Sequence, residues 1–308
     1  EGTVSFHRSA EDHAVKIGSS PEYSISIDGT PPEVKLIYPN GGEYLSGIVK
    51  IKWKVSDNKD ASPQIQLWCG NGTEWNIIGS TFGKNEYDWN SSSLPDGKNY
   101  SIQIVATDRA GNSNSDTSDS TFIIDNTPPD TTINLSGIKN GEWFLSDVTV
   151  TLNATDALSG IDLIKYRIDE NEWNNYTQPF KISESGIFNI TYYSVDKAGN
   201  KEEEKITTVK IDKNAPSITI NRPKEGYLYL FGREITKTIF RSTIVIGEID
   251  VDVSVTSETS PIEKVEFYIN DEIKYIDNDA PYGWKIEEKG LGNLVLKIVA
   301  YNTAGNFG

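Results

Sequence analysis

The stretch Ile124-Asp125-Asn126-Thr127-Pro128-Pro129 decides the fold, because related stretches recur in the chain. They read Ile27-Asp28-Gly29-Thr30-Pro31-Pro32 and Ile211-Asp212-Lys213-Asn214-Ala215-Pro216. Successive aspartates are 97 residues apart (28 to 125) and 87 residues apart (125 to 212). Proline fixes φ and donates no backbone hydrogen bond, so it is excluded from the interior of a sheet. Since each copy lies between two β-rich runs, the phrase predicts a stiff joint where one module ends and the next begins.

A second phrase lies shortly before each of the later joints. It occurs at Asp108–Asn112 and Asp196–Asn200 as Asp-x-Ala-Gly-Asn, and at Asn302–Asn306 with asparagine in the first position. The first two copies begin 17 residues before Asp125 and 16 residues before Asp212. The aspartate is suited to accept hydrogen bonds from backbone amides of the turn, and Gly-Asn suits positive φ. The phrase therefore predicts a tight turn after a strand.

The two phrases together divide the 308 residues into modules. We expect modules at 29–125, 126–213 and 214–308, each near the size of one β-sandwich. Residues 1–28, in which Ser9–Ala14 is a degenerate copy of the turn, are expected to form the closing hairpin of a preceding module. By the same spacing, the last strand of the third module is expected beyond Gly308.

Alternating hydrophobicity predicts β-strands throughout the chain. Ile51, Trp53 and Val55 alternate with lysines, which is the period of a half-buried strand with Trp53 in the core. No helical period persists over three turns, and short strands between turn signals are typical of sandwiches. Residues 227–241 have no counterpart in the other modules and predict an added hairpin. The expected strands are 34–38, 49–55, 64–69, 75–78, 100–107, 121–125, 131–135, 148–153, 163–168, 180–182, 188–195, 205–211, 217–220, 227–230, 244–255, 264–269, 273–276 and 294–301.

Several motifs resemble extracellular immunoglobulin-like repeats of archaea and bacteria. The motifs are Tyr166–Asp169 with Trp173, Tyr176 and Tyr192–Asn200 in module two, Val265–Asp271 with Ala280–Trp284 in module three, and Tyr38–Glu43 with Trp53 in module one. The resemblance implies tandem immunoglobulin-like sandwiches at a cell surface, and the stiff joints predict that they are arranged as a rod. Such modules occur in adhesins, surface-layer proteins, filaments and the tails of secreted hydrolases. Fold alone does not give an activity.

Composition argues against several functions. The formal net charge of −16 disfavours nucleic acid as a partner. The chain has two histidines, His7 and His13, and no Gly-rich phosphate loop, HExxH or CxxC motif, so we expect no enzyme. Its one cysteine, Cys69, is expected in the core. The acidic run Glu202–Glu204 is expected on the surface, and no segment is apolar enough to insert into a membrane.

Calcium is the one cofactor that the sequence suggests. Asp28, Asp125 and Asp212 at the joints, with Asp108 and Asp196 in the turns, supply oxygen ligands of the kind that calcium prefers. Joints of surface proteins that this chain resembles often bind calcium. The alternative, that these aspartates only cap turns, stays open, and Asn302 replaces the aspartate that the resembled family has in its turn.

Modules one and two are rich in sequons for N-glycosylation. Such an acceptor carries glycan only on an exported chain, so these sites predict a glycoprotein of the cell surface. The candidate acceptors are Asn71, Asn90, Asn99, Asn134, Asn153, Asn175 and Asn189.

The sequence thus predicts a non-catalytic structural segment of a cell-surface protein, namely a surface-layer, stalk or filament subunit. Its expected partners are further copies or neighbouring surface proteins, reached by donation of a strand to an open sheet edge. One alternative is an adhesin or carbohydrate-binding array, and another is an accessory region of a secreted hydrolase. The array would use the aromatic residues Trp75, Trp89, Trp143 and Trp173.

Overall fold

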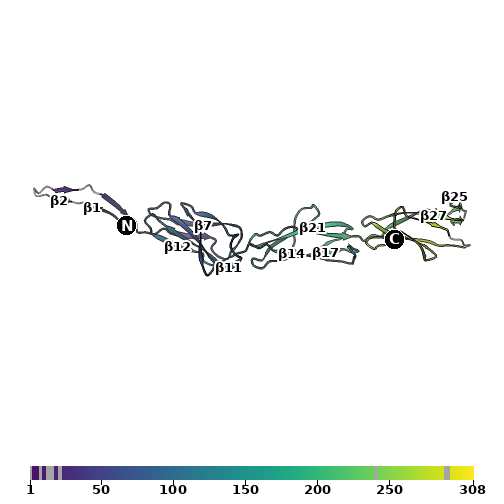
Figure 1. The fold of residues 1–308 in the computed structure, drawn as a ribbon, viewed down its shortest axis with the longest axis horizontal. Helices are drawn as coiled ribbons and strands as arrows, with labels where there is room; N and C mark the ends of the chain where they lie inside the picture. Colours follow the sequence, from purple (N-terminus) through teal and green to yellow (C-terminus); the bar gives the residue numbers. More distant parts are fainter. Residues whose placement is uncertain (1, 7–8, 12–16, 20–22, 240–241, 288–291) are drawn as a thin grey trace. The chain divides into compact units, whose positions relative to one another are not determined.

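The computed structural model describes residues 2–6, 9–11, 17–19, 23–239, 242–287 and 292–308. All regular structure in these residues is β-strand, which confirms the predicted all-β class (Figure 1). The strands of the described residues form three successive sandwiches. Among the described residues, no helix has the length and hydrophobicity needed to cross a bilayer.

The first sandwich packs two sheets around one core. One sheet has the order β10-β7-β5 and the other β6-β13-β11-β8-β9, with β12 also paired to β11. Trp53 is 1% exposed at the centre of β7, as the alternation predicts, and Cys69 is buried on β8. The strands are β5 (Glu33–Tyr38), β6 (Tyr44–Leu45), β7 (Ile48–Ser56), β8 (Gln64–Gly70), β9 (Trp75–Phe82), β10 (Glu86–Asn90), β11 (Gly97–Thr107), β12 (Ser113–Thr117) and β13 (Phe122–Ile124).

The second sandwich repeats this plan. Its sheets have the orders β14-β17-β20 and β15-β16-β22-β21-β18-β19. In both sandwiches the closing strand, β13 or β22, pairs in parallel with a two-residue strand, β6 or β16, and antiparallel with the strand that leads into the turn. The strands are β14 (Asp130–Ser136), β15 (Lys139–Asn140), β16 (Trp143–Phe144), β17 (Val148–Thr155), β18 (Ile161–Ile168), β19 (Asn174–Asn175), β20 (Phe180–Ile182), β21 (Gly186–Asp196) and β22 (Lys205–Ile211).

The third sandwich carries the predicted insertion. Sheets β23-β27-β30 and β29-β28-β31 enclose its core, and the added residues form a third sheet, β25-β24-β26. The single strand predicted over 244–255 is wrong, because Gly247 (φ 92°) separates two strands that belong to different sheets. The strands are β23 (Ser217–Arg222), β24 (Tyr227–Leu230), β25 (Arg233–Lys237), β26 (Ile244–Ile246), β27 (Ile249–Thr256), β28 (Ile262–Ile269), β29 (Glu272–Asp277), β30 (Gly283–Ile286) and β31 (Leu296–Asn302).

The segment before the first sandwich forms two short antiparallel pairs. β1 (Gly2–Phe6) pairs with β4 (Tyr23–Ile27), and β2 (Ser9–Glu11) pairs with β3 (Ile17–Ser19). Residues 9–11 are therefore strand and not the turn that the sequence predicted. The rest of that turn, with His13, and also His7, lie outside the described residues.

Contacts divide the chain into two compact units. The first comprises residues 1–130, 154–163 and 194–203, and the second comprises residues 131–153, 164–193 and 204–308. The core of the first sandwich lies in the first unit, and the cores of the second and third sandwiches lie in the second. The arrangement as a rod stays a prediction.

Candidate metal centres

The two Asp-x-Ala-Gly-Asn turns and the related turn Asn302–Asn306 close with the same hydrogen bonds. In the first, the Asp108 N–H donates to the Asn112 carbonyl at 3.0 Å and the Asn112 N–H donates to Asp108 Oδ1 at 2.8 Å. The turn that begins at Asp196 repeats these bonds at 3.1 and 2.8 Å, and the turn that begins at Asn302 repeats them at 3.0 and 2.9 Å. The fourth residue of each turn is a glycine with φ of 88° to 93°, which other residues adopt only with strain.

The last asparagine of each turn also holds the joint that precedes its sandwich. Its Nδ2 donates to the backbone carbonyl of the joint aspartate, so a turn at one end of a sandwich binds the incoming chain. The pairs are Asn112 with Asp28 at 3.3 Å, Asn200 with Asp125 at 2.7 Å, and Asn306 with Asp212 at 3.0 Å. The same clamp thus recurs at all three joints.

The first joint gathers three carboxylates. Asp28 precedes the first sandwich, Asp57 follows β7 and Asp108 begins the turn, and their carboxylate oxygens lie within 4.8 Å of one another. Asp108 is buried and the other two are half-buried. The Oδ2 atom of Asp57 is enclosed and accepts no hydrogen bond. An enclosed oxygen without a donor costs about 1–3 kcal/mol, and a cation bound at this atom would offset that cost.

The second joint gathers three carboxylates in the same way. Asp125 follows β13, Asp156 follows β17 and Asp196 begins the turn, again with oxygens within 4.8 Å of one another. Asp125 and Asp196 are 0% and 1% exposed. The first and second sandwiches therefore each contribute two carboxylates to a cluster, and the segment before each sandwich contributes the third.

Two of the six carboxylates, Asp108 and Asp156, have pKa values lowered by hydrogen-bond donors around them. Burial raises the pKa of Asp156, but the N–H groups of Gly160 and its neighbours outweigh burial, so the pKa lies below its ordinary value. Asp108 follows the same pattern, because the donors of Asn112 outweigh the effect of burial on its pKa. In the part of the chain that the structure describes, none of the six carboxylates forms an ion pair with a basic side chain. Each cluster therefore concentrates negative charge that a divalent cation would offset.

The donor sets fit calcium. They consist of carboxylate oxygens, which hard cations prefer, and the backbone carbonyls of the joint provide the kind of ligand that completes a calcium shell. Bound calcium would supply positive charge that joins three separate segments of chain. Of the five predicted ligands, four lie in these clusters, whereas Asp212 belongs to no such group among the described residues.

Sequence reasoning missed Asp57 and Asp156. Both occupy the first position after an alternating strand, in Ser56-Asp57 and Thr155-Asp156. The recurrence of a hydroxyl residue and an aspartate at this position was the available signal. The corresponding residue after β27 is Ser257.

Part of the chain matches a known family. Residues 83–165 match the model of a bacterial Ig-like domain (group 3), a segment that runs from the first sandwich through the second joint and into the second sandwich. No curated protein matches the chain. With the observed sheets, this match makes the chain an all-β protein of tandem Ig-like sandwiches.

Three solved structures with tandem modules show a weak similarity to this chain. The fibronectin(III)-like modules of Clostridium thermocellum CbhA share 14% identity, with a TM-score of 0.36, over 58% of this chain and 94% of theirs. A Ca²⁺-stabilised, ice-binding adhesin of an Antarctic bacterium shares 15%, with a TM-score of 0.34, over 97% and 78%. The tetra-tandem repeat in the extending region of a large adhesion protein shares 15%, with a TM-score of 0.34, over 99% and 79%.

The glycosylation candidates all lie on the surface of the first two Ig-like sandwiches. Each of the seven acceptor asparagines is exposed, which an attached glycan requires. Asn71 accepts hydrogen bonds from the N–H and the hydroxyl of Thr73, its own sequon threonine, at 3.0 and 2.8 Å. Whether any of them carries glycan stays a prediction.

The tryptophans predicted to bind carbohydrate are divided between core and surface. Trp89 and Trp143 are only 5% and 8% exposed, so their prediction as exposed platforms is wrong. Trp75 is 45% exposed, but its ring covers Gly70, where a Cβ would lie 2.9 Å from the indole. The half-buried Trp173 packs against Tyr193 in a T-shaped arrangement, with ring centroids 4.8 Å apart. None of the four is a free, flat aromatic surface.

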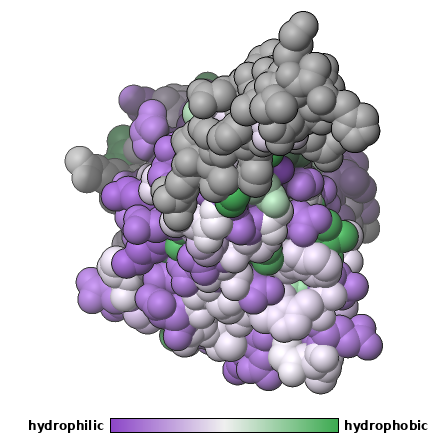
Figure 2. Space-filling model, turned by 90° about the vertical axis from the view of Figure 1, so that its left-hand side faces the viewer, coloured by the Kyte–Doolittle hydropathy of each residue, from purple (hydrophilic) through white to green (hydrophobic). Residues whose placement is uncertain are grey.

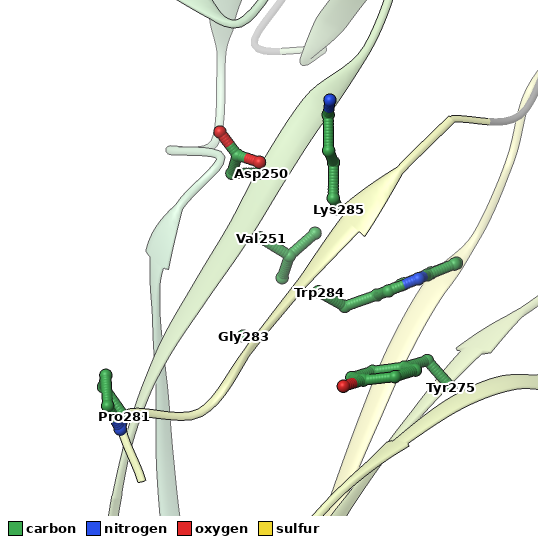
Figure 3. A pocket seen from close by; sticks show the side chains of 7 residues that line it. All are labelled: Asp250, Val251, Tyr275, Pro281, Gly283, Trp284 and Lys285. Carbon is green, nitrogen blue, oxygen red and sulfur yellow. The ribbon is translucent and has the colours of Figure 1, made fainter. Parts of the chain in front are cut away.

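A cavity of about 520 Å³ in the third sandwich also has aromatic walls. Figure 3 shows the Tyr275 and Trp284 rings lying parallel beside it, with Lys285 pointing away from them. The two rings stack at 6.4 Å and both lie 6.1 Å from Phe267, a core residue that is fully buried. Trp284 therefore packs against the core of this sandwich, whereas Tyr275 is 41% exposed.

Two predictions about other side chains have different outcomes. Cys69 is buried as expected, and burial raises the pKa of its thiol to about 12. The prediction that Glu202 lies on the surface is wrong, because it is 6% exposed and accepts the Ser194 N–H at 2.7 Å and the Ser194 hydroxyl at 2.8 Å.

The face of the molecule seen in Figure 2 is mainly hydrophilic, with small separate hydrophobic spots.

Proposed function

We propose that this chain is a non-catalytic spacer of an extracellular protein, in which calcium at the first two joints fixes successive Ig-like sandwiches to one another. The two clusters of three carboxylates carry this proposal. Every cluster takes one ligand from the chain before a sandwich and two from the sandwich itself. A cation bound to all three therefore restrains the joint.

The side-chain chemistry supports a structural role more than a catalytic or an adhesive one. The buried, hydrogen-bonded carboxylates at the joints have no neighbouring histidine or cysteine among the described residues that would make them part of a catalytic site. The core positions of Trp89 and Trp143 weigh against the carbohydrate-binding alternative. A stalk, surface layer or filament would each use such a spacer.

Calorimetric titration of the chain with calcium tests the proposal. We expect two bound ions per chain, one for each cluster. Calcium sites of extracellular modules have dissociation constants of about 0.1–1 mM, so the titration should extend to about 10 mM. The variant carrying Asp57→Asn and Asp156→Asn should lose both sites, since asparagine keeps the shape and removes the charge.

The control is Asp162→Asn, which removes an exposed carboxylate of the second sandwich outside either cluster. This variant should bind calcium as the wild type does. Small-angle scattering of the same samples should show a wider distribution of dimensions in chelator than in calcium. Absence of binding up to about 10 mM would exclude calcium as the restraint at the joints.

A further inference from the structure

The joint before the third sandwich has the same backbone as the other two and different chemistry. Asp212, Ser260 and Asn302 meet there, and all three are at most 1% exposed. Asn302 stands where the other turns have aspartate, and Ser257 stands where Asp57 and Asp156 follow their strands. One carboxylate thus replaces a cluster of three.

Hydrogen-bond donors take the place of a cation around this carboxylate. Asp212 Oδ2 accepts the Ser260 N–H at 3.1 Å, the Ser260 hydroxyl, and Asn302 Nδ2–H at 3.0 Å. Asp212 Oδ1 accepts the Asn214 N–H at 3.0 Å. A buried carboxylate with this many donors is satisfied without a counter-ion.

Comparison with the second joint shows which contacts are new. Among the described residues, the donors to the Asp125 carboxylate are both backbone groups, Thr127 N–H at 3.2 Å and Ser159 N–H at 2.9 Å. The hydroxyl of Ser159, the counterpart of Ser260, is 3.4 Å from Asp156 instead. At the third joint the hydroxyl donates to Asp212, and an amide N–H replaces a carboxylate oxygen.

The orientation of the Asn302 amide is fixed by its neighbours. Its Oδ1 accepts the Asn306 N–H at 2.9 Å, and its Nδ2 donates to Asp212 and to the Asn214 carbonyl at 3.2 Å. A reversed amide would place its oxygen against two acceptors and its NH₂ against a donor. The donor therefore points at Asp212.

We propose that the third joint is a cation-independent form of the other two, in which the Asn302 amide and the Ser260 hydroxyl take over the role of the bound ion. The proposal rests on the calcium sites proposed for the first two joints. Under this proposal, docking at the first two joints depends on the calcium concentration, whereas the third joint stays docked without calcium.

Hydrogen exchange read by mass spectrometry tests this in the wild-type chain. On transfer from calcium to chelator, the amides of Ser159 and Asn200 at the second joint should exchange about tenfold faster or more, while those of Ser260 and Asn306 change by less than about twofold. Equal acceleration at Ser260 and Asn306 would overturn the inference. An unchanged rate at Ser159 and Asn200 would count against the calcium sites, so the two failures are distinguishable.

The double variant with Ser257→Asp and Asn302→Asp tests the substitution directly. It restores three carboxylates, so we expect a third bound calcium in calorimetry and calcium-dependent exchange at Ser260 and Asn306. The converse variant, with Asp156→Ser and Asp196→Asn, should bind one ion in place of two. If the restored cluster binds no further ion while the first two sites do, the amide and hydroxyl do not stand in a cation's place.

Discussion

Asp156→Asn should destabilise the chain in calcium and leave its stability nearly unchanged without calcium. Asp156 lies within 4.8 Å of the carboxylates of Asp125 and Asp196. Even at the dielectric constant of water, each of these two repulsions costs about 0.9 kcal/mol. Asparagine removes both, and its Oδ1 still accepts the Leu158 and Gly160 N–H groups, which lie at 3.0 and 2.6 Å in the wild type. The loss of charge weakens each of these two hydrogen bonds by about 1 kcal/mol, so the gain and the loss nearly cancel without calcium.

In calcium the same substitution removes a ligand. Binding at 100 times the dissociation constant stabilises a folded state by about 2.7 kcal/mol, which for a domain of this size is roughly 10–20 °C in melting temperature. Calorimetric melting of wild type and variant in calcium and in chelator measures both effects. We expect melting temperatures that agree within about 5 °C in chelator and separate in calcium by the larger amount. Equal losses in both solutions would falsify the reasoning, because Asp156 would then be a turn cap alone, and Asp162→Asn serves as the control.

Three further outcomes follow from single groups. Asn200→Ala removes the hydrogen bond from Asn200 Nδ2 to the Asp125 carbonyl and should lower the free energy of unfolding by about 1–3 kcal/mol. Asn171→Ala, at an exposed position, should change this free energy little, and chemical denaturation of both variants measures the difference. The pKa of Asp156 is lowered in the folded protein, so its ionised carboxylate stabilises the folded state fully above the ordinary value of 3.8, and this stabilisation is lost as the pH falls through the lowered pKa. Thermal melts between pH 5 and pH 2 should show the loss in the wild type and a smaller loss in Asp156→Asn. The Cys69 thiol, with its pKa raised to about 12, should resist alkylation at pH 8 until the sandwich unfolds, and rapid labelling of the native chain would refute this protection. Because the thiol ionises more easily in the unfolded chain, the free energy of unfolding should also fall as the pH rises above the ordinary thiol value of 9.0.

The repeats made most of the fold predictable. The joints and turns carry proline, glycine and asparagine at positions where the backbone demands them, so the sequence marks them directly. Alternation on β7 and β17 predicts their buried faces equally well, because the side-chain period of a strand is local. The break at Gly247 was missed, since hydrophobic residues continue on both sides of it and only the assignment to two sheets separates them.

The candidate metal centres were half predictable for a similar reason. Asp108 and Asp125 stand in recurring phrases, and their spacing suggested a shared role. Asp57 and Asp156 come from a different strand, and only the packing of the two sheets brings them to the joint. Glu202 shows the same limit, because its run of acidic neighbours hides the buried bond to Ser194. Contacts between distant segments depend on register and packing, which residue type alone does not reveal.

Calcium binding and docking of a joint are coupled, because the three carboxylates of each proposed site come from both sides of the joint. Under the proposed function, full affinity requires Asp125, from the end of the first sandwich, to lie beside Asp156 and Asp196 of the second. An undocked joint offers at most two of the three carboxylates, so calcium binds it more weakly and shifts the population toward the docked form. The shift is limited by the difference in affinity between the two forms. At the third joint Asn302 and Ser260 are part of the chain, so their contribution does not vary with calcium. Under the two proposals, the replacement of two aspartates by neutral residues would be sufficient to turn a calcium-dependent joint into a permanent one.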